Sequence, residues 1–128
     1  MKYAVLFIAL LFAGCGGGSS TVGYEIEIDG GTVQVAKEDF FLKRDWDDAN
    51  SACENLGDGW RLPSLSEFEK MYELHRQGKG NFENDFYWCR SEFSQNEAVA
   101  VDFSNYGEFD YYFKNKNDFR VRAVRYKP

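Results

Sequence analysis

Hydrophobic and polar residues alternate in two stretches that follow the first 20 residues. Residues 24–28 (YEIEI) have the period of two that is typical of a half-buried strand, and residues 32–35 (TVQV) repeat it. The residues between them, 29–31 (DGG), are typical of a tight turn. The pattern therefore predicts a β-hairpin. Residues 40–42 (FFL) follow as a short apolar run that predicts either a strand or a loop anchored in the core.

Two helices are predicted next. Apolar residues recur at helical spacing over residues 46–56, with Asp45 placed to cap the helix and Gly57 to end it. Ser64 and Glu67 form a capping box that predicts the start of a second helix, which should end before Gly78. Each helix should bury one face.

The remainder of the chain has the pattern of short strands. We expect strands at residues 86–89, 98–103, 109–113 and 119–126, separated by Asn- and Gly-containing turns. The order is a hairpin, two helices and a meander. This order predicts one α+β domain in which two helices pack on an antiparallel sheet.

The first 14 residues have a different character. Lys2 precedes an apolar run, residues 3–12, that is too short to span a bilayer and is typical of a secretory signal peptide. Residues 11–15 (LFAGC) resemble a bacterial lipobox, which implies cleavage before Cys15, acylation of Cys15 and anchoring in a membrane through acyl chains. The alternative is an ordinary signal peptide. We therefore expect a signal peptide at residues 1–14, a Gly/Ser tether at 15–23 and a domain at 24–128. Because Gly16 is not aspartate, the lipobox resemblance implies an outer-membrane lipoprotein, facing either the periplasm or the outside.

Several motifs occur together in the domain. Residues 59–64 (GWRLPS) run into the second helix, residues 87–88 (YW) start a strand, and residues 121–125 (VRAVR) lie near the end. Together they resemble the Lcl C-terminal domain family, also called the major paralogous domain of bacterial lipoproteins. The resemblance covers about residues 30–126 and implies a C-type lectin-like fold and a role in binding. Such domains often pair a last-strand cysteine with one in the first helix, but Ala123 stands at that last-strand position.

The three cysteines raise the question of a disulfide. With Cys15 acylated, Cys53 and Cys89 remain as an even number of thiols in an oxidising compartment, which favours a disulfide between them. The alternative is two buried thiols in separate parts of the core. The sequence leaves both open.

Composition and charge restrict the class of ligand that the domain can bind. The formal net charge is −6, which disfavours nucleic acid, and aromatic residues make up 18% of the chain. Aromatic side chains of residues 106–113 can stack on a sugar ring or on a partner protein. Side-chain oxygens in the turn that follows offer hydrogen bonds or calcium ligands, but we interpret them as turn residues and expect no metal or cofactor. The candidate ligand-binding residues are Tyr106, Asp110, Tyr111, Asn115, Asn117 and Asp118.

The remaining polar residues are interpreted as structural. Trp60 and Leu62 should point into the core, while Arg61 pairs with a carboxylate on a neighbouring loop. We likewise expect salt bridges for Arg120, Arg122 and Arg125, and a structural role for His75.

No pair of carboxylates stands out as a glycosidase would require. The hypothesis is a non-enzymatic cell-envelope lipoprotein whose domain binds a glycan or a surface protein. The alternative is an enzyme, or an accessory domain of one, acting on polysaccharide.

Overall fold

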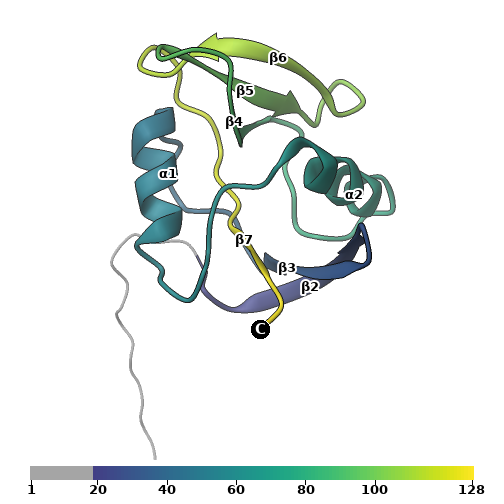
Figure 1. The fold of residues 1–128 in the computed structure, drawn as a ribbon. Helices are drawn as coiled ribbons and strands as arrows, with labels where there is room; N and C mark the ends of the chain where they lie inside the picture. Colours follow the sequence, from purple (N-terminus) through teal and green to yellow (C-terminus); the bar gives the residue numbers. More distant parts are fainter. Residues whose placement is uncertain (1–18) are drawn as a thin grey trace, which may run out of the picture.

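Residues 19–128 are described by a computed structural model of the chain. The predicted signal peptide and residues 15–18 of the predicted tether, including Cys15, lie outside the described residues. The elements, in chain order, are β2 (Val22–Ile28), β3 (Gly31–Ala36), α1 (Trp46–Glu54), α2 (Leu65–Arg76), β4 (Phe86–Glu92), β5 (Glu97–Asp102), β6 (Glu108–Phe113) and β7 (Val124–Tyr126). The α+β class is confirmed. The single sheet expected from the sequence is wrong, because the strands form two three-stranded antiparallel sheets, β2-β3-β7 and β4-β5-β6 (Figure 1).

The predicted hairpin is present as β2 and β3. Its strands pair in an antiparallel register that sets Ile26 opposite Val33, and both side chains are buried. β2 begins at Val22, and the carbonyl of Thr21 accepts a hydrogen bond from the Lys37 N–H at 2.9 Å. The last residues of the predicted tether therefore belong to the sheet.

Both helices begin at the predicted caps. The Asp45 side chain accepts a hydrogen bond from the Asp48 N–H at 2.9 Å, and Ser64 and Glu67 form the capping box. α1 packs against β4, whereas α2 packs against β2 and β4. The helices thus lie on opposite sides of the molecule, with α2 between the two sheets (Figure 1).

The core consists of two clusters, because β4 and β5 are buried on both faces. Tyr87, Val99 and Val101 belong to one cluster, which lies against α2; Trp88 and Ala100, on the opposite faces of the same strands, belong to the other. We call these the α2 cluster and the α1 cluster. Alternation along a strand sends successive side chains to opposite faces, so each of these strands contributes to both clusters.

The last segment differs from the prediction of one strand over residues 119–126. Only Val124–Tyr126 forms a strand, β7. The segment before it crosses from one sheet to the other and changes its backbone partner as it goes. The Arg120 N–H donates to Phe86, and the Val121 carbonyl accepts from the Phe40 N–H. No partner strand runs alongside it for long enough to form a ladder.

Candidate functional site

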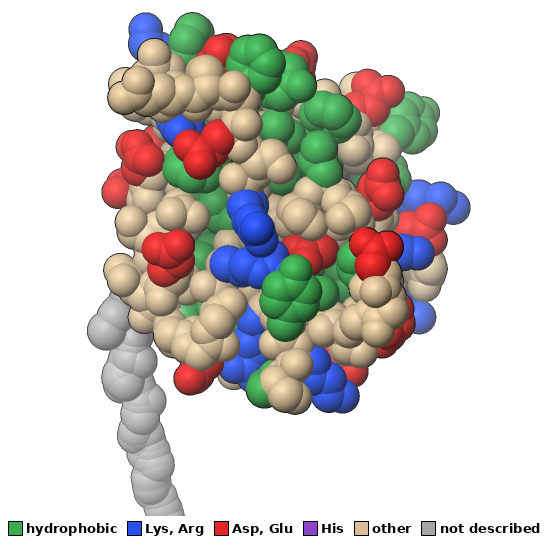
Figure 2. All heavy atoms as spheres, in the orientation of Figure 1, with side chains coloured by type: hydrophobic (Ala, Val, Ile, Leu, Met, Phe, Trp, Pro, Cys, Tyr) green, Lys and Arg blue, Asp and Glu red, His purple; other side chains and the backbone are tan. Residues whose placement is uncertain are grey.

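Four exposed aromatic residues gather around β6. We call the set Phe93, Phe109, Tyr111 and Phe113 the aromatic face; their side chains are between 44% and 60% exposed. Phe93 stacks on Tyr111 with ring centroids 4.3 Å apart, and Phe109 lies 6.4 Å from Tyr111. Figure 2 shows hydrophobic side chains along the upper end of the molecule, where β6 lies. A surface of this kind marks an interaction site more often than an isolated exposed ring does.

The aromatic face is held rigidly from its other side. Tyr112 points to the opposite face of β6 and packs edge-on against Phe86 and Phe119, at 5.5 and 5.2 Å between ring centroids. β6 is also paired along its whole length with β5. The exposed rings are therefore presented on a preformed strand.

The structure separates the predicted ligand residues. Tyr111 lies in the aromatic face, but Asp110 lies on the other face of β6, where its carboxylate accepts a hydrogen bond from the Tyr111 N–H at 2.7 Å. Tyr106 is 82% exposed in the turn before β6 and has a left-handed backbone with φ 58°. Among the described residues, the Tyr106 ring contacts none of the rings of the aromatic face.

The polar candidates lie in the turn after β6. Asn117 donates a hydrogen bond to the Phe113 carbonyl at 3.0 Å, so it ties this turn to the strand, while Asn115 and Asp118 are exposed. Between residues 19 and 128, no three His, Cys, Asp or Glu side chains gather in an arrangement that would hold a metal ion. Phe93 was missed by sequence reasoning, since a lone aromatic residue in a polar loop carries no periodic signal.

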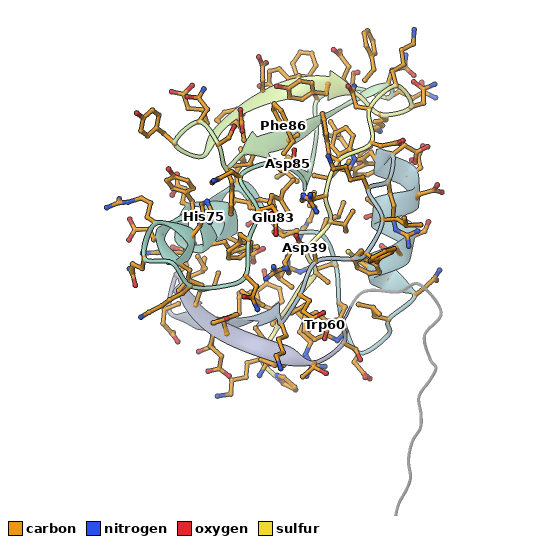
Figure 3. The ribbon with its side chains drawn as sticks, turned by 180° about the vertical axis from the view of Figure 1, so that it is seen from behind. Asp39, Trp60, His75, Glu83, Asp85 and Phe86 are labelled. Carbon is orange, nitrogen blue, oxygen red and sulfur yellow. The ribbon has the colours of Figure 1, made fainter. Side chains whose placement is uncertain are left out.

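A cleft of about 730 Å³ lies elsewhere on the molecule. It is lined by Glu38, Asp39, Phe40, Phe41, His75, Gly78, Lys79, Asn81, Phe82, Glu83 and Arg120. Seen from behind, Asp39 and Glu83 lie near the centre of the molecule and His75 lies to one side on α2 (Figure 3). The volume is in the range of small-molecule sites.

A network of buried polar groups forms the floor of the cleft. Tyr87 donates its hydroxyl hydrogen to one oxygen of Asp39 at 2.7 Å, and Arg122 donates to the other oxygen at 2.8 Å. Burial raises the pKa of Asp39 despite the opposing effect of Arg122. Arg122 is fully buried and also donates to the carbonyls of Ala36, Gly80 and Asn81. Both oxygens of Asp39 are thus engaged in holding the loops together.

Arg120, which lines the cleft, is paired with Asp85. Asp85 accepts hydrogen bonds from Lys43 and Arg120, each at 2.9 Å. Burial acts to raise the pKa of Asp85, but hydrogen bonds from Lys43, the Phe86 N–H and Arg120 outweigh it and hold the pKa below its ordinary value. His75 stacks on Phe103 at 5.3 Å and shares a hydrogen bond of 2.7 Å with Asn84, as a structural histidine would.

The Gly-Trp-Arg-Leu-Pro segment is part of the core, as predicted. Trp60 and Leu62 are buried in the α1 cluster. Arg61 forms two parallel hydrogen bonds to Glu67, at 2.9 and 2.8 Å, so its carboxylate partner lies on α2 and not on the neighbouring loop that we expected. Arg125 also departs from the expected salt bridge, because it donates to the amide oxygen of Gln34 at 2.9 Å and stacks over Trp60.

The disulfide favoured by the cysteine count is absent from the structure. Cys53 and Cys89 are both free and buried, which is the alternative that the sequence left open. Cys53 belongs to the α1 cluster, as Trp88 does, whereas Cys89 belongs to the α2 cluster. Because Trp88 and Cys89 are neighbours on β4, their side chains point to opposite faces of the strand, and β4 separates the two thiols.

No family model matches the chain, and no curated protein matches it. Within residues 19–128, no helix is both long enough and apolar enough to cross a lipid bilayer. The similarity to the Lcl C-terminal domain family therefore rests on the motifs of the sequence alone.

Proposed function

We propose that this chain is a cell-envelope lipoprotein whose domain is a binding module, with the aromatic face as its ligand surface. One observation carries the proposal, namely that Phe109, Tyr111 and Phe113 stay about half exposed on a paired strand, with Phe93 stacked on Tyr111 beside them. Leaving this much aromatic surface in water has a cost of about 25 cal/mol per Å² that binding would recover. The C-type lectin-like fold belongs to this proposal and rests on the motif resemblance.

A polysaccharide is the ligand class that we favour. Aromatic rings stack on the C–H faces of sugar rings, and the Tyr111 hydroxyl adds a hydrogen-bonding group in the middle of the face. The surface is shallow, which suits a chain of sugars better than a small molecule that must be enclosed. A surface protein that binds the same face is the other outcome of the test.

A glycan array with residues 19–128 tests the ligand class, and two matched variants locate the site. Tyr111→Ala should abolish binding, because Tyr111 lies at the centre of the aromatic face. Phe41→Ala is the control, since Phe41 is an even more exposed aromatic residue that lines the cleft. Binding that survives Tyr111→Ala but not Phe41→Ala would move the site to the cleft and contradict the proposal.

The enzyme alternative rests on the carboxyl groups at the cleft. Asp39 is bound by Arg122 and Tyr87, so its oxygens are not free to attack a sugar or to activate water. Glu38 and Glu83 form no ion pair within the described residues, but both are exposed. Release of reducing ends from an array-positive polysaccharide, lost on Glu83→Gln, would favour the enzyme over the binding module.

The membrane anchor is tested at Cys15. Cys15→Ala in the full chain should remove the protein from the membrane fraction or leave it unprocessed, as loss of acylation requires. Mass spectrometry of the parent chain should find acyl chains on Cys15. Mature protein that is bound to membranes without acyl chains would contradict this part of the proposal.

A further inference from the structure

β6 is an open sheet edge: within the described chain, no strand or other segment pairs with its outer side. On β4, the N–H groups of Trp88 and Arg90 donate to the crossing segments at 3.1 and 2.8 Å. β7 exchanges two hydrogen bonds with Arg61, and β2 carries charged side chains. Proteins protect sheet edges in these ways because an open edge pairs with another strand. β6 also carries two charged residues, Glu108 and Asp110, but it presents the aromatic face beside them.

The backbone groups that β6 turns outward belong to its aromatic residues. The Lys114 N–H donates to the Asn96 carbonyl on the β5 side at 2.8 Å. Because successive residues of a strand direct their N–H and C=O groups to opposite sides, the even-numbered residues of β6 direct these groups toward β5 and the odd-numbered residues direct them toward solvent. Two of the outward groups are occupied by polar side chains: Asp110 accepts from the Tyr111 N–H, and Asn117 donates to the Phe113 carbonyl. Both contacts are made by exposed side chains that another strand can displace.

The residues of β6 whose backbone groups point outward are arranged symmetrically about Tyr111. Phe109 and Phe113 lie two residues before and two residues after Tyr111. An antiparallel copy of β6, centred on Tyr111, therefore sets Phe109 opposite the Phe113 of the other chain and Tyr111 opposite itself. Aromatic pairs directly opposite each other stabilise antiparallel strands.

The charges along β6 select the same arrangement. Glu108 begins the strand and is exposed, and Lys116 follows its end and is also exposed. Lys114 is buried and paired with Glu92 of its own chain, so it adds nothing to this pattern. An antiparallel copy brings the acidic half of one strand toward the basic end of the other, while a parallel copy would set like charges side by side. A two-fold axis through Tyr111 satisfies the aromatic pattern and the charge pattern together.

We propose that two copies of this chain associate through antiparallel pairing of β6 with β6, on a two-fold axis at Tyr111, to form one continuous six-stranded sheet. The pairing joins the two aromatic faces into one surface. It goes beyond the proposed function, because it requires no ligand. A contact of one strand per chain is small, so the dimer should form at high local concentration, as on a membrane surface.

Disulfide trapping tests the axis directly. Residues paired across a hydrogen-bonded antiparallel position have Cα atoms about 5.5 Å apart, which is within disulfide range. Tyr111→Cys in the full chain, oxidised in isolated membranes, should give a covalent dimer of the chain with itself. Tyr106→Cys is the matched control, because Tyr106 is more exposed but lies off the strand and should give none. The parent chain, oxidised in the same way, is the control for crosslinks that form through the native cysteines.

The outcomes separate cleanly. Failure of Tyr111→Cys to form the dimer, or equal trapping at Tyr106, would overturn the proposal, and so would a crosslink from position 111 to a different protein.

Light scattering of the detergent-solubilised full chain adds a second measurement: Tyr111→Lys should weaken dimerisation about tenfold or more by setting two cations face to face. Asp110→Ala should strengthen dimerisation, since it frees the Tyr111 N–H. Both measurements are made without glycan, so they stand or fall independently of the binding proposal.

Discussion

Replacing Trp60 with alanine is expected to lower the free energy of unfolding by about 3–5 kcal/mol, the cost of removing a buried tryptophan. Trp60 is 2% exposed and packs in the α1 cluster, and its truncation also removes the stacking of Arg125 over the indole at 4.8 Å. For a domain of about 100 residues, each kcal/mol shifts the melting temperature by about 4 °C or more. The loss should therefore appear as a fall of at least about 12 °C in thermal unfolding followed by circular dichroism.

A more conservative substitution at the same position tests the contribution of the indole N–H to the free energy of unfolding. The indole N–H of Trp60 is buried without a hydrogen-bond partner in the described chain, whereas that of Trp46 donates to the Cys89 carbonyl at 2.9 Å. Trp60→Phe removes an unsatisfied donor, but Trp46→Phe removes a formed hydrogen bond and leaves a buried carbonyl unpaired. We expect Trp46→Phe to cost more by about 1–3 kcal/mol.

Two results would refute this reasoning. Equal losses for Trp46→Phe and Trp60→Phe would mean that the N–H of Trp60 has a partner in solution. An unchanged melting temperature for Trp60→Ala, together with loss of glycan binding, would make the Gly-Trp-Arg-Leu-Pro segment a ligand site and not part of the core.

Three further predictions concern buried polar groups and thiols. Arg122→Met should lower the free energy of unfolding by about 3–5 kcal/mol in urea denaturation, because it leaves the Asp39 carboxyl buried without its cation; Asp39→Asn in the same chain should recover part of the loss. Burial acts to raise the pKa of Glu67, but the hydrogen bonds and charge of Arg61, together with the hydrogen bonds of Ser64, outweigh it and hold the pKa below its ordinary value of 4.5. The stabilisation from Glu67 is therefore present above pH 4.5 and is lost as the pH falls through the lowered pKa, so Glu67→Gln should flatten the melting temperature against pH in that window. Burial raises the pKa of Cys53 to about 12 and also raises that of Cys89, so both thiols should react with a thiol reagent only after unfolding, without added reductant; a disulfide-linked peptide in non-reducing mass spectrometry would contradict this.

Local signals predicted most of the secondary structure. Asp45 and Ser64 cap the two helices because their side chains bond N–H groups three residues away, and such short-range chemistry is visible in sequence. The hairpin was equally visible, since its alternation and turn are both local. Expectations that depend only on neighbouring residues were therefore confirmed.

Long-range pairing was not visible in sequence. The expected salt bridge of Arg122 is present, but its burial was not predicted, because it depends on acceptors from two separate segments, residues 36–39 and 80–81, that surround the side chain. The division into two sheets depends in the same way on where residues 114–123 cross the molecule. The aromatic face appears only once β6 is known to lie at an edge, since the same alternation in a central strand would have buried those rings.

The placement of β2 and β6 has a mechanical consequence. The described chain enters the domain at β2, in the sheet at the lower end of Figure 1, and the aromatic face lies on the sheet at the upper end. If the chain is anchored before β2 and holds a ligand at β6, as we propose, tension between cell and ligand runs through the whole domain. That tension crosses from one sheet to the other along residues 114–123, so the bonds of Arg122 to the surrounding loops would set how much force the attachment withstands before the sheets part.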